Sequence, residues 1–162
     1  MFGTTHLHPM IVHFPIALLI VGFLSDLIGV FLKKDFFSKA GFYLLILGTA
    51  GVIAAYFSGN IAGDGVSEAG VLKQALENHE EAAELSLWLM VIASVVRIGI
   101  VLFKKYSGIF KWVAILLFLA GILSIARTGY YGGELVFKHA AGVQLNLGLD
   151  FNSTNSNNSE ED

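Results

Sequence analysis

The sequence predicts an all-α integral membrane protein, a four-helix bundle with up-down connections. Hydrophobic residues make up 55% of the 162 residues and charged residues only 14%, with a mean hydropathy of +0.69. A soluble domain of this size needs far more charge on its surface. The apolar residues fall into four blocks, each long enough for a hydrocarbon core that takes about 20 helical residues. The blocks lack the period-two alternation of barrel strands, which leaves helices as the expected spans.

The four spans are expected at about residues 10–32, 40–57, 82–103 and 109–131 of one transmembrane domain, residues 1–149. Each is rich in Leu, Ile, Val, Phe and Ala. Residues 1–10 contain no Lys or Arg, so we expect the first span to remain in the protein instead of acting as a cleaved signal peptide. Residues 150–162 are mostly Asn, Ser and acidic residues and are expected to form a disordered polar tail.

The lysines predict the orientation of the bundle. Six of the ten basic residues lie in the two short loops, namely Lys33, Lys34 and Lys39 in one and Lys104, Lys105 and Lys111 in the other. The positive-inside rule places both loops in the cytoplasm, with the two chain ends and the loop at residues 58–81 outside. Loops this short also make consecutive helices antiparallel neighbours.

The two halves of the chain resemble each other, which predicts a tandem duplication of a two-helix hairpin. Residues 58–66 align with residues 128–136 at an offset of 70 (128 − 58). At an offset of 71 (79 − 8), the matched positions are His8 and His79, Asp26 and Arg97, and the lysine pairs at 33–34 and 104–105. A pseudo-twofold axis along the membrane normal would relate the halves, so the first and third spans are expected to lie diagonally across the bundle.

Asp26 and Arg97 are intramembrane charges at matching depths of these two diagonal spans. A lone charge in the bilayer is costly, so we expect a structural ion pair in the bundle interior that fixes the helix register. A proton or ion path is the alternative, although no further polar residues extend such a route in the sequence.

The histidines give the main functional signal, because all five fall toward the outer side: His6, His8, His13, His79 and His139. The chain has no cysteine, so any metal or cofactor must be held by His, carboxylate or Met. Haem b accepts two axial imidazoles, and facing helices of a bundle can supply one each. The candidate ligands for haem, or alternatively for copper or zinc, are His8, His13, His79 and His139, with Arg127 as a partner for a haem propionate.

Three functions remain open from the residues alone. The first is a b-type cytochrome-like electron-transfer subunit that exchanges electrons with a periplasmic cytochrome or a quinone. The second is a membrane scaffold with structural histidines, and the third a copper- or zinc-binding protein. No nucleophile–base–acid set or phosphate loop is visible, which favours a carrier or accessory subunit over a stand-alone enzyme. The net charge of −3 gives no sign of nucleic-acid binding, and the oligomeric state stays open.

The opening segment His-Pro-Met-Ile-Val-His-Phe-Pro, residues 8–15, resembles the signature of a bacterial membrane-protein family known as domain of unknown function 2231. Residues 132–139 resemble its closing signature, and His79 matches a further family histidine. The similarity covers about residues 7–143. It implies a four-span bundle in the bacterial inner membrane with the same four histidines as site residues, and His6 outside the pattern. Family members are sometimes joined to cytochrome c-type or Rieske-type domains, which favours an electron-transfer role.

Overall fold

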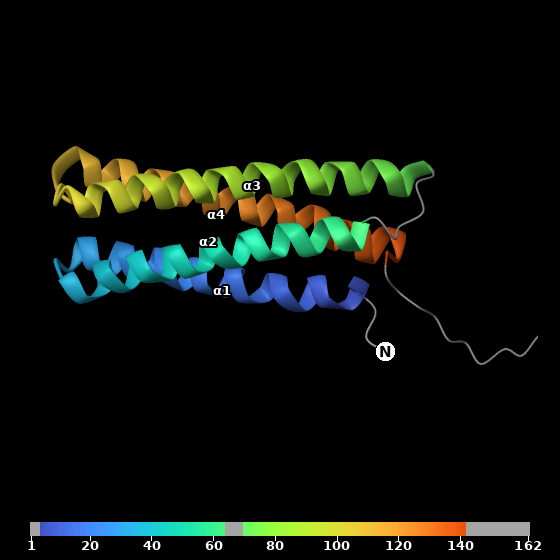
Figure 1. Ribbon diagram of the computed structural model, residues 1–162, viewed down its shortest axis with the longest axis horizontal. Coiled ribbons are helices and arrows are strands. Elements are labelled where there is room, and N and C mark those ends of the chain that lie inside the picture. Colours follow the sequence, from blue (N-terminus) through green and yellow to red (C-terminus); the bar gives the residue numbers. More distant parts are fainter. Residues whose placement is uncertain (1–3, 64–69, 142–162) are drawn as a thin grey trace, which may run out of the picture.

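The computed structural model describes residues 4–63 and 70–141, with side chains from His8 onward. These residues form four helices and no strand: α1 (Thr4–Phe31), α2 (Asp35–Gly63), α3 (Gly70–Leu102) and α4 (Gly108–His139). The prediction of an all-α four-helix bundle is confirmed (Figure 1). The polar tail predicted at residues 150–162 lies outside the described residues.

The helices run up and down, so that both hairpin turns lie at one end of the bundle (left in Figure 1). We call this the lysine end, because the turns hold residues 32–34 and 103–107. The opposite, histidine end holds the starts of α1 and α3 and the ends of α2 and α4. All four helices are long and apolar enough to cross a membrane.

The helices extend beyond the spans expected from hydropathy, mainly at the histidine end. They have 28, 29, 33 and 32 residues. At 1.5 Å per residue they measure about 42–50 Å, against about 30 Å for a hydrocarbon core. Helix α3 begins at Gly70, well before the expected start at residue 82, because polar residues 73–81 are good helix formers. Helix turns therefore project out of the membrane and carry the polar residues at this end.

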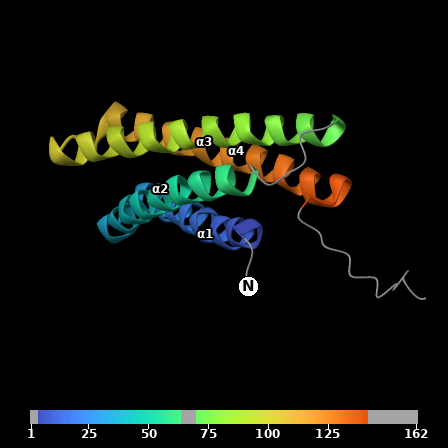
Figure 2. The same ribbon diagram turned by 45° about the vertical axis from the view of Figure 1, so that its right-hand side comes forward.

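The bundle consists of two hairpins, α1–α2 and α3–α4, which are inclined to each other in Figure 2. Backbone contacts join the neighbours within each hairpin and also join α2 to α3 and α1 to α4, whereas the diagonal pairs are apart. In the centre, each helix contributes one large apolar side chain to a buried cluster: Leu19, Leu45, Met90 and Phe118. Large apolar side chains cover the outward faces, as expected where helices face lipid.

The same packing contacts occur in both hairpins. An added Cβ at Gly48 would meet the side chain of Leu19, and one at Gly121 would meet that of Met90. Gly59 lies against the ring of His8 in the same way as Gly132 lies against that of His79. These contacts relate α1 to α3 by 71 residues (90 − 19) and α2 to α4 by 73 residues (121 − 48). The offset of 70 expected for residues 58–66 is therefore wrong by nearly one helical turn.

The difference between the two offsets comes from the hairpin turns. Both begin alike: Lys33 and Lys104 have positive φ of 53° and 54°, and the N–H groups of Lys34 and Lys105 donate back to the carbonyls of Gly29 and Ile100. This is the left-handed ending common at helix C-termini. The first turn spans residues 32–34, whereas the second spans residues 103–107. The second hairpin thus gains Tyr106 and Ser107.

Gly41→Ala is expected to lower the free energy of unfolding by about 1–3 kcal/mol, the usual cost of overpacking. The added Cβ would lie 2.8 Å from the Cβ of Asp26 and 2.9 Å from the carbonyl oxygen of Gly22, and a backbone atom cannot move aside easily. Gly129→Ala is the matched control, since its Cβ would meet nothing within 4 Å. Thermal unfolding in detergent measures both, and equal midpoints for the two variants would contradict the close α1–α2 packing.

Candidate functional site

Two histidines face each other across the diagonal of the bundle at the histidine end. His8 of α1 and His79 of α3 have ring centroids 6.4 Å apart, with ring planes at 80°. The backbones of α1 and α3 are not in contact, so these side chains meet in the middle of the bundle. Both rings are partly buried.

Hydrogen bonds fix the proton of each ring on Nδ1. Nδ1 of His8 lies 3.0 Å from Oγ of Ser58, and that hydroxyl donates its only proton to the carbonyl of Ala55 at 2.9 Å. Oγ of Ser58 must therefore accept from His8. Nδ1 of His79 lies 3.2 Å from the carbonyl oxygen of Thr128, which can only accept. With the proton on Nδ1, each neutral ring carries a bare lone pair on Nε2, and neither Nε2 has a hydrogen-bond partner among the described residues.

A buried hydroxyl cluster supports the His79 side of the pair. Oγ of Ser86 lies 2.8 Å from both Oγ of Ser124 and Oγ1 of Thr128, and it donates to the carbonyl of Ala82 at 2.9 Å. These contacts join α3 to α4 and hold in place the carbonyl that His79 contacts. A histidine whose hydrogen-bond partner is itself held in place in this way keeps its ring orientation.

The other candidates lie apart from this pair. His13 is exposed on α1, with Nδ1 2.5 Å from the carbonyl oxygen of Pro9. His139 is in the last turn of α4, and Arg127 is exposed with its guanidinium 5.5 Å from the ring of Tyr131. Residue 6 falls within α1, but its side chain is outside the described part. Among the described residues no group of three or more His, Asp or Glu could hold a metal ion.

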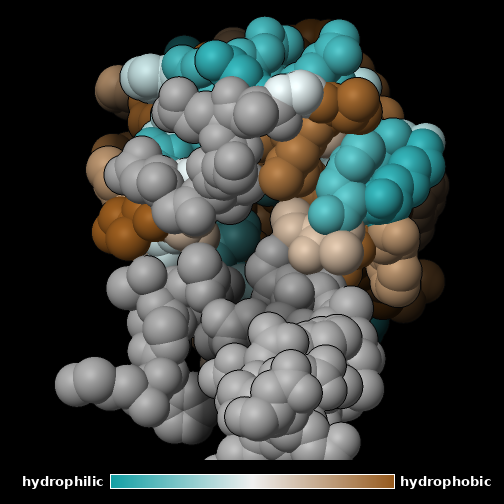
Figure 3. Space-filling model, turned by 90° about the vertical axis from the view of Figure 1, so that its right-hand side faces the viewer, coloured by the Kyte–Doolittle hydropathy of each residue, from teal (hydrophilic) through white to brown (hydrophobic). Residues whose placement is uncertain are grey.

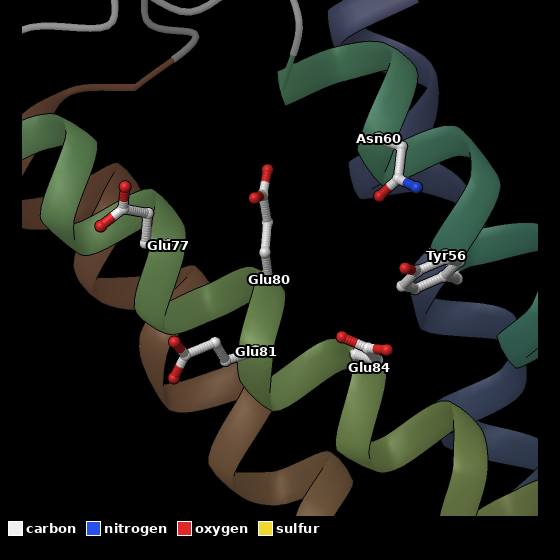
Figure 4. A pocket seen from close by; sticks show the side chains of 6 residues that line it. All are labelled: Tyr56, Asn60, Glu77, Glu80, Glu81 and Glu84. Carbon is white, nitrogen blue, oxygen red and sulfur yellow. The ribbon is translucent and has the colours of Figure 1, made fainter.

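An acidic cleft of about 450 Å³ lies between α2 and α3 at the same end. Its lining is Tyr56 and Asn60 from α2 and Glu77, Glu80, Glu81 and Glu84 from α3 (Figure 4). Figure 3 looks onto this end, and the hydrophilic surface gathers over the start of α3 at the top. The cleft gives this end a negative electrostatic potential.

The lysine end holds a second buried polar group, built around Asp26 and Arg97, which are 3% and 2% exposed. Nη2 of Arg97 lies 2.9 Å from Oδ1 of Asp26, and the hydroxyl of Tyr106 donates to the same oxygen at 2.8 Å. The guanidinium carbon of Arg97 lies 3.4 Å from the ring centroid of Tyr106. Burial raises the pKa of Tyr106 well above its ordinary value, so the hydroxyl stays protonated and remains a donor.

Comparison with protein families gives one match, over residues 4–145, to a family described as predicted membrane protein (DUF2231). The chain belongs to this family. No curated protein and no solved structure matches it. The matched region contains all four helices of this DUF2231 protein, together with His8, His79 and the buried ion pair.

The sequence did not reveal which residues of the DUF2231 bundle form hydrogen bonds with the two histidines and with the buried ion pair. Ser58 and Thr128 were seen only as aligned positions of the repeat, and no contact with a histidine was predicted for either. Ser58 contacts His8 through its hydroxyl, whereas Thr128 contacts His79 through its backbone carbonyl. Tyr106 has no counterpart in the first turn, which was the one available signal of a special role. The buried hydroxyl contact between Thr49 and Ser94, at 2.8 Å, was also unexpected in apolar spans.

Proposed function

We propose that this protein is a membrane electron carrier that holds a low-spin haem b between His8 and His79. The observation that carries the proposal is the hydrogen bonding of the two facing rings, each of which places Nδ1 against an oxygen atom and leaves Nε2 without a partner among the described residues. Metal-binding histidines typically show this pattern, in which the second nitrogen donates to a carbonyl or another acceptor. A haem at this point would supply reversible one-electron exchange at its iron.

The spacing of the rings would let both histidines hold one metal ion. An imidazole nitrogen lies about 2 Å from a bound metal, so two rings on opposite sides have centroids roughly 6 Å apart. The centroids of His8 and His79 are 6.4 Å apart. Copper or zinc held by protein alone needs a third ligand, and the described residues offer no such group of three. A porphyrin brings its own four nitrogens, so a site with two protein ligands favours haem.

The surroundings suggest the partner. The histidine end projects beyond the apolar part of the helices, where a soluble protein can approach. The acidic cleft beside it would favour a basic partner, such as a periplasmic cytochrome, through charge complementarity. A quinone from the bilayer is the alternative electron partner. Arg127 stays the candidate for a propionate, since it directly precedes Thr128, whose carbonyl contacts His79, on the outer half of α4.

The absorption spectrum of protein purified from haem-replete cells tests the proposal. We expect the dithionite-reduced minus air-oxidised difference to show low-spin b-type haem, with about one haem per chain. A colourless, well-folded protein would exclude the haem. Metal analysis of the same sample then separates a copper or zinc site from purely structural histidines.

We also propose that the lysine end faces the cytoplasm of a bacterial inner membrane and that both chain ends are periplasmic, following the lysine distribution. A reporter fused after Asp162 is expected to read as periplasmic. A reporter inserted at Ser107, in the second turn, is expected to read as cytoplasmic. A cytoplasmic signal from the C-terminal fusion would reverse the orientation and place the histidine pair on the other side.

A further inference from the structure

The two hairpins differ at the lysine end, although the rest of their packing repeats. In the first hairpin, Gly29 lies directly against Ser38, so that α1 and α2 touch up to the turn. In the second hairpin the longer turn, residues 103–107, connects α3 to α4. An added Cβ at Gly99, near the end of α3, would meet nothing within 4 Å. At the lysine end, the two helices of the second hairpin are therefore separated by an opening, whereas those of the first hairpin are in contact.

The opening forms a groove of about 420 Å³ between α3 and α4. Its lining is apolar apart from one lysine: Val96, Gly99, Ile100, Phe103, Phe110, Val113 and Lys105. Gly99 adds no side chain to the groove. Phe103, the first residue of the turn, and Phe110 of α4 supply its aromatic lining. Nζ of Lys105 lies 5.7 Å from the ring centroid of Phe110, so the ammonium group of the lysine lies over the face of this ring.

We propose that this groove binds one anionic phospholipid, with an acyl chain along Gly99 and Val113 and the phosphate at Lys105. The apolar lining suits a hydrocarbon chain, and the lysine lies where the helices end, which is the depth of a headgroup. Lys104 and Lys111 stand on either side of Lys105 in the sequence and add positive charge. Basic pockets between transmembrane helices are a known kind of anionic headgroup site.

The repeat supplies a matched control for the lysine of the site. Lys34 corresponds to Lys105 at the offset of 71 (105 − 34) and follows the same left-handed turn residue. It belongs to the closed first hairpin, and it lines neither the acidic cleft nor the groove of the described residues. A general attraction of lysines for anionic lipid would affect both positions, whereas a groove site depends on Lys105 alone.

Native mass spectrometry of the full chain, titrated with phosphatidylglycerol or phosphatidylcholine, tests the proposal. We expect one phosphatidylglycerol bound about ten-fold more tightly than phosphatidylcholine, and a loss of about five-fold in Lys105→Ala but not in Lys34→Ala. Gly99→Leu should fill the groove and abolish the specific binding of phosphatidylglycerol.

Lys105 is exposed, so Lys105→Ala keeps the fold and decides the question even if Gly99→Leu does not fold. Equal affinities for the two lipids would indicate an apolar groove without headgroup recognition and would overturn the proposal. Equal losses in Lys34→Ala and Lys105→Ala would overturn it as well.

Discussion

Asp26→Ala or Arg97→Ala alone is expected to reduce the yield of folded protein several-fold, and the double substitution is expected to recover part of it. Each side chain is almost completely buried, and the two form a direct ion pair at 2.9 Å. Removing one partner leaves an uncompensated buried charge, which destabilises a protein by about 3–5 kcal/mol. Removing both leaves no charge behind, so the loss is smaller.

Size-exclusion chromatography of the detergent-solubilised variants measures this recovery. Tyr106→Phe is the matched mild variant, since it keeps the ring over the guanidinium and loses only the hydrogen bond to Asp26. It is expected to cost about 1.5–3 kcal/mol of stability, because a hydrogen bond to a charged group is lost. Single substitutions that leave the yield unchanged would show that the pair is not buried in the membrane-embedded protein.

The second large effect concerns haem retention. His8→Ala and His79→Ala are each expected to reduce haem content by at least about ten-fold, because each would remove one of the two proposed haem ligands. His13→Ala and His139→Ala are expected to keep the wild-type haem content, since neither ring belongs to the facing pair. Haem per chain, measured after purification, gives the comparison. A loss in His13→Ala as severe as that in His79→Ala would assign the ligands differently.

Ser58→Ala extends this series to the hydrogen-bond partner of His8. It removes the acceptor that holds the Nδ1 proton of His8, and loss of such a partner typically weakens metal binding by about 10–100-fold. The variant keeps both imidazoles, so it should lower haem affinity without removing low-spin haem altogether. An unchanged affinity would mean that the Ser58 contact does not orient His8.

The sequence was sufficient for the fold because membrane spans are set by length and hydropathy, which are local properties. It also suggested that His8 and His79 are related, since an offset of 71 joins them as it joins Asp26 to Arg97. The register of α2 against α4 could not be read in this way, because small residues recur too often to fix an alignment. It required the glycine contacts of Leu19 and Met90.

Other features depend on contacts between distant segments. Ser58 determines the protonation of His8 from another helix, and no local pattern marks it. Tyr106 reaches back 80 residues to Asp26, so its role follows only from how the second turn folds over the ion pair. The ends of α2 and α4 at the histidine end were also missed, because hydropathy detects the apolar part of a helix and not its polar continuation.

Electron paramagnetic resonance of the oxidised protein tests the assignment of His8 and His79 most directly, because the signal reports the axial ligands of ferric haem. We predict a low-spin ferric signal for the wild-type protein, and its loss in both His8→Ala and His79→Ala. His13→Ala should retain the wild-type signal. A low-spin signal that persists in either His8→Ala or His79→Ala would contradict haem ligation by this histidine pair.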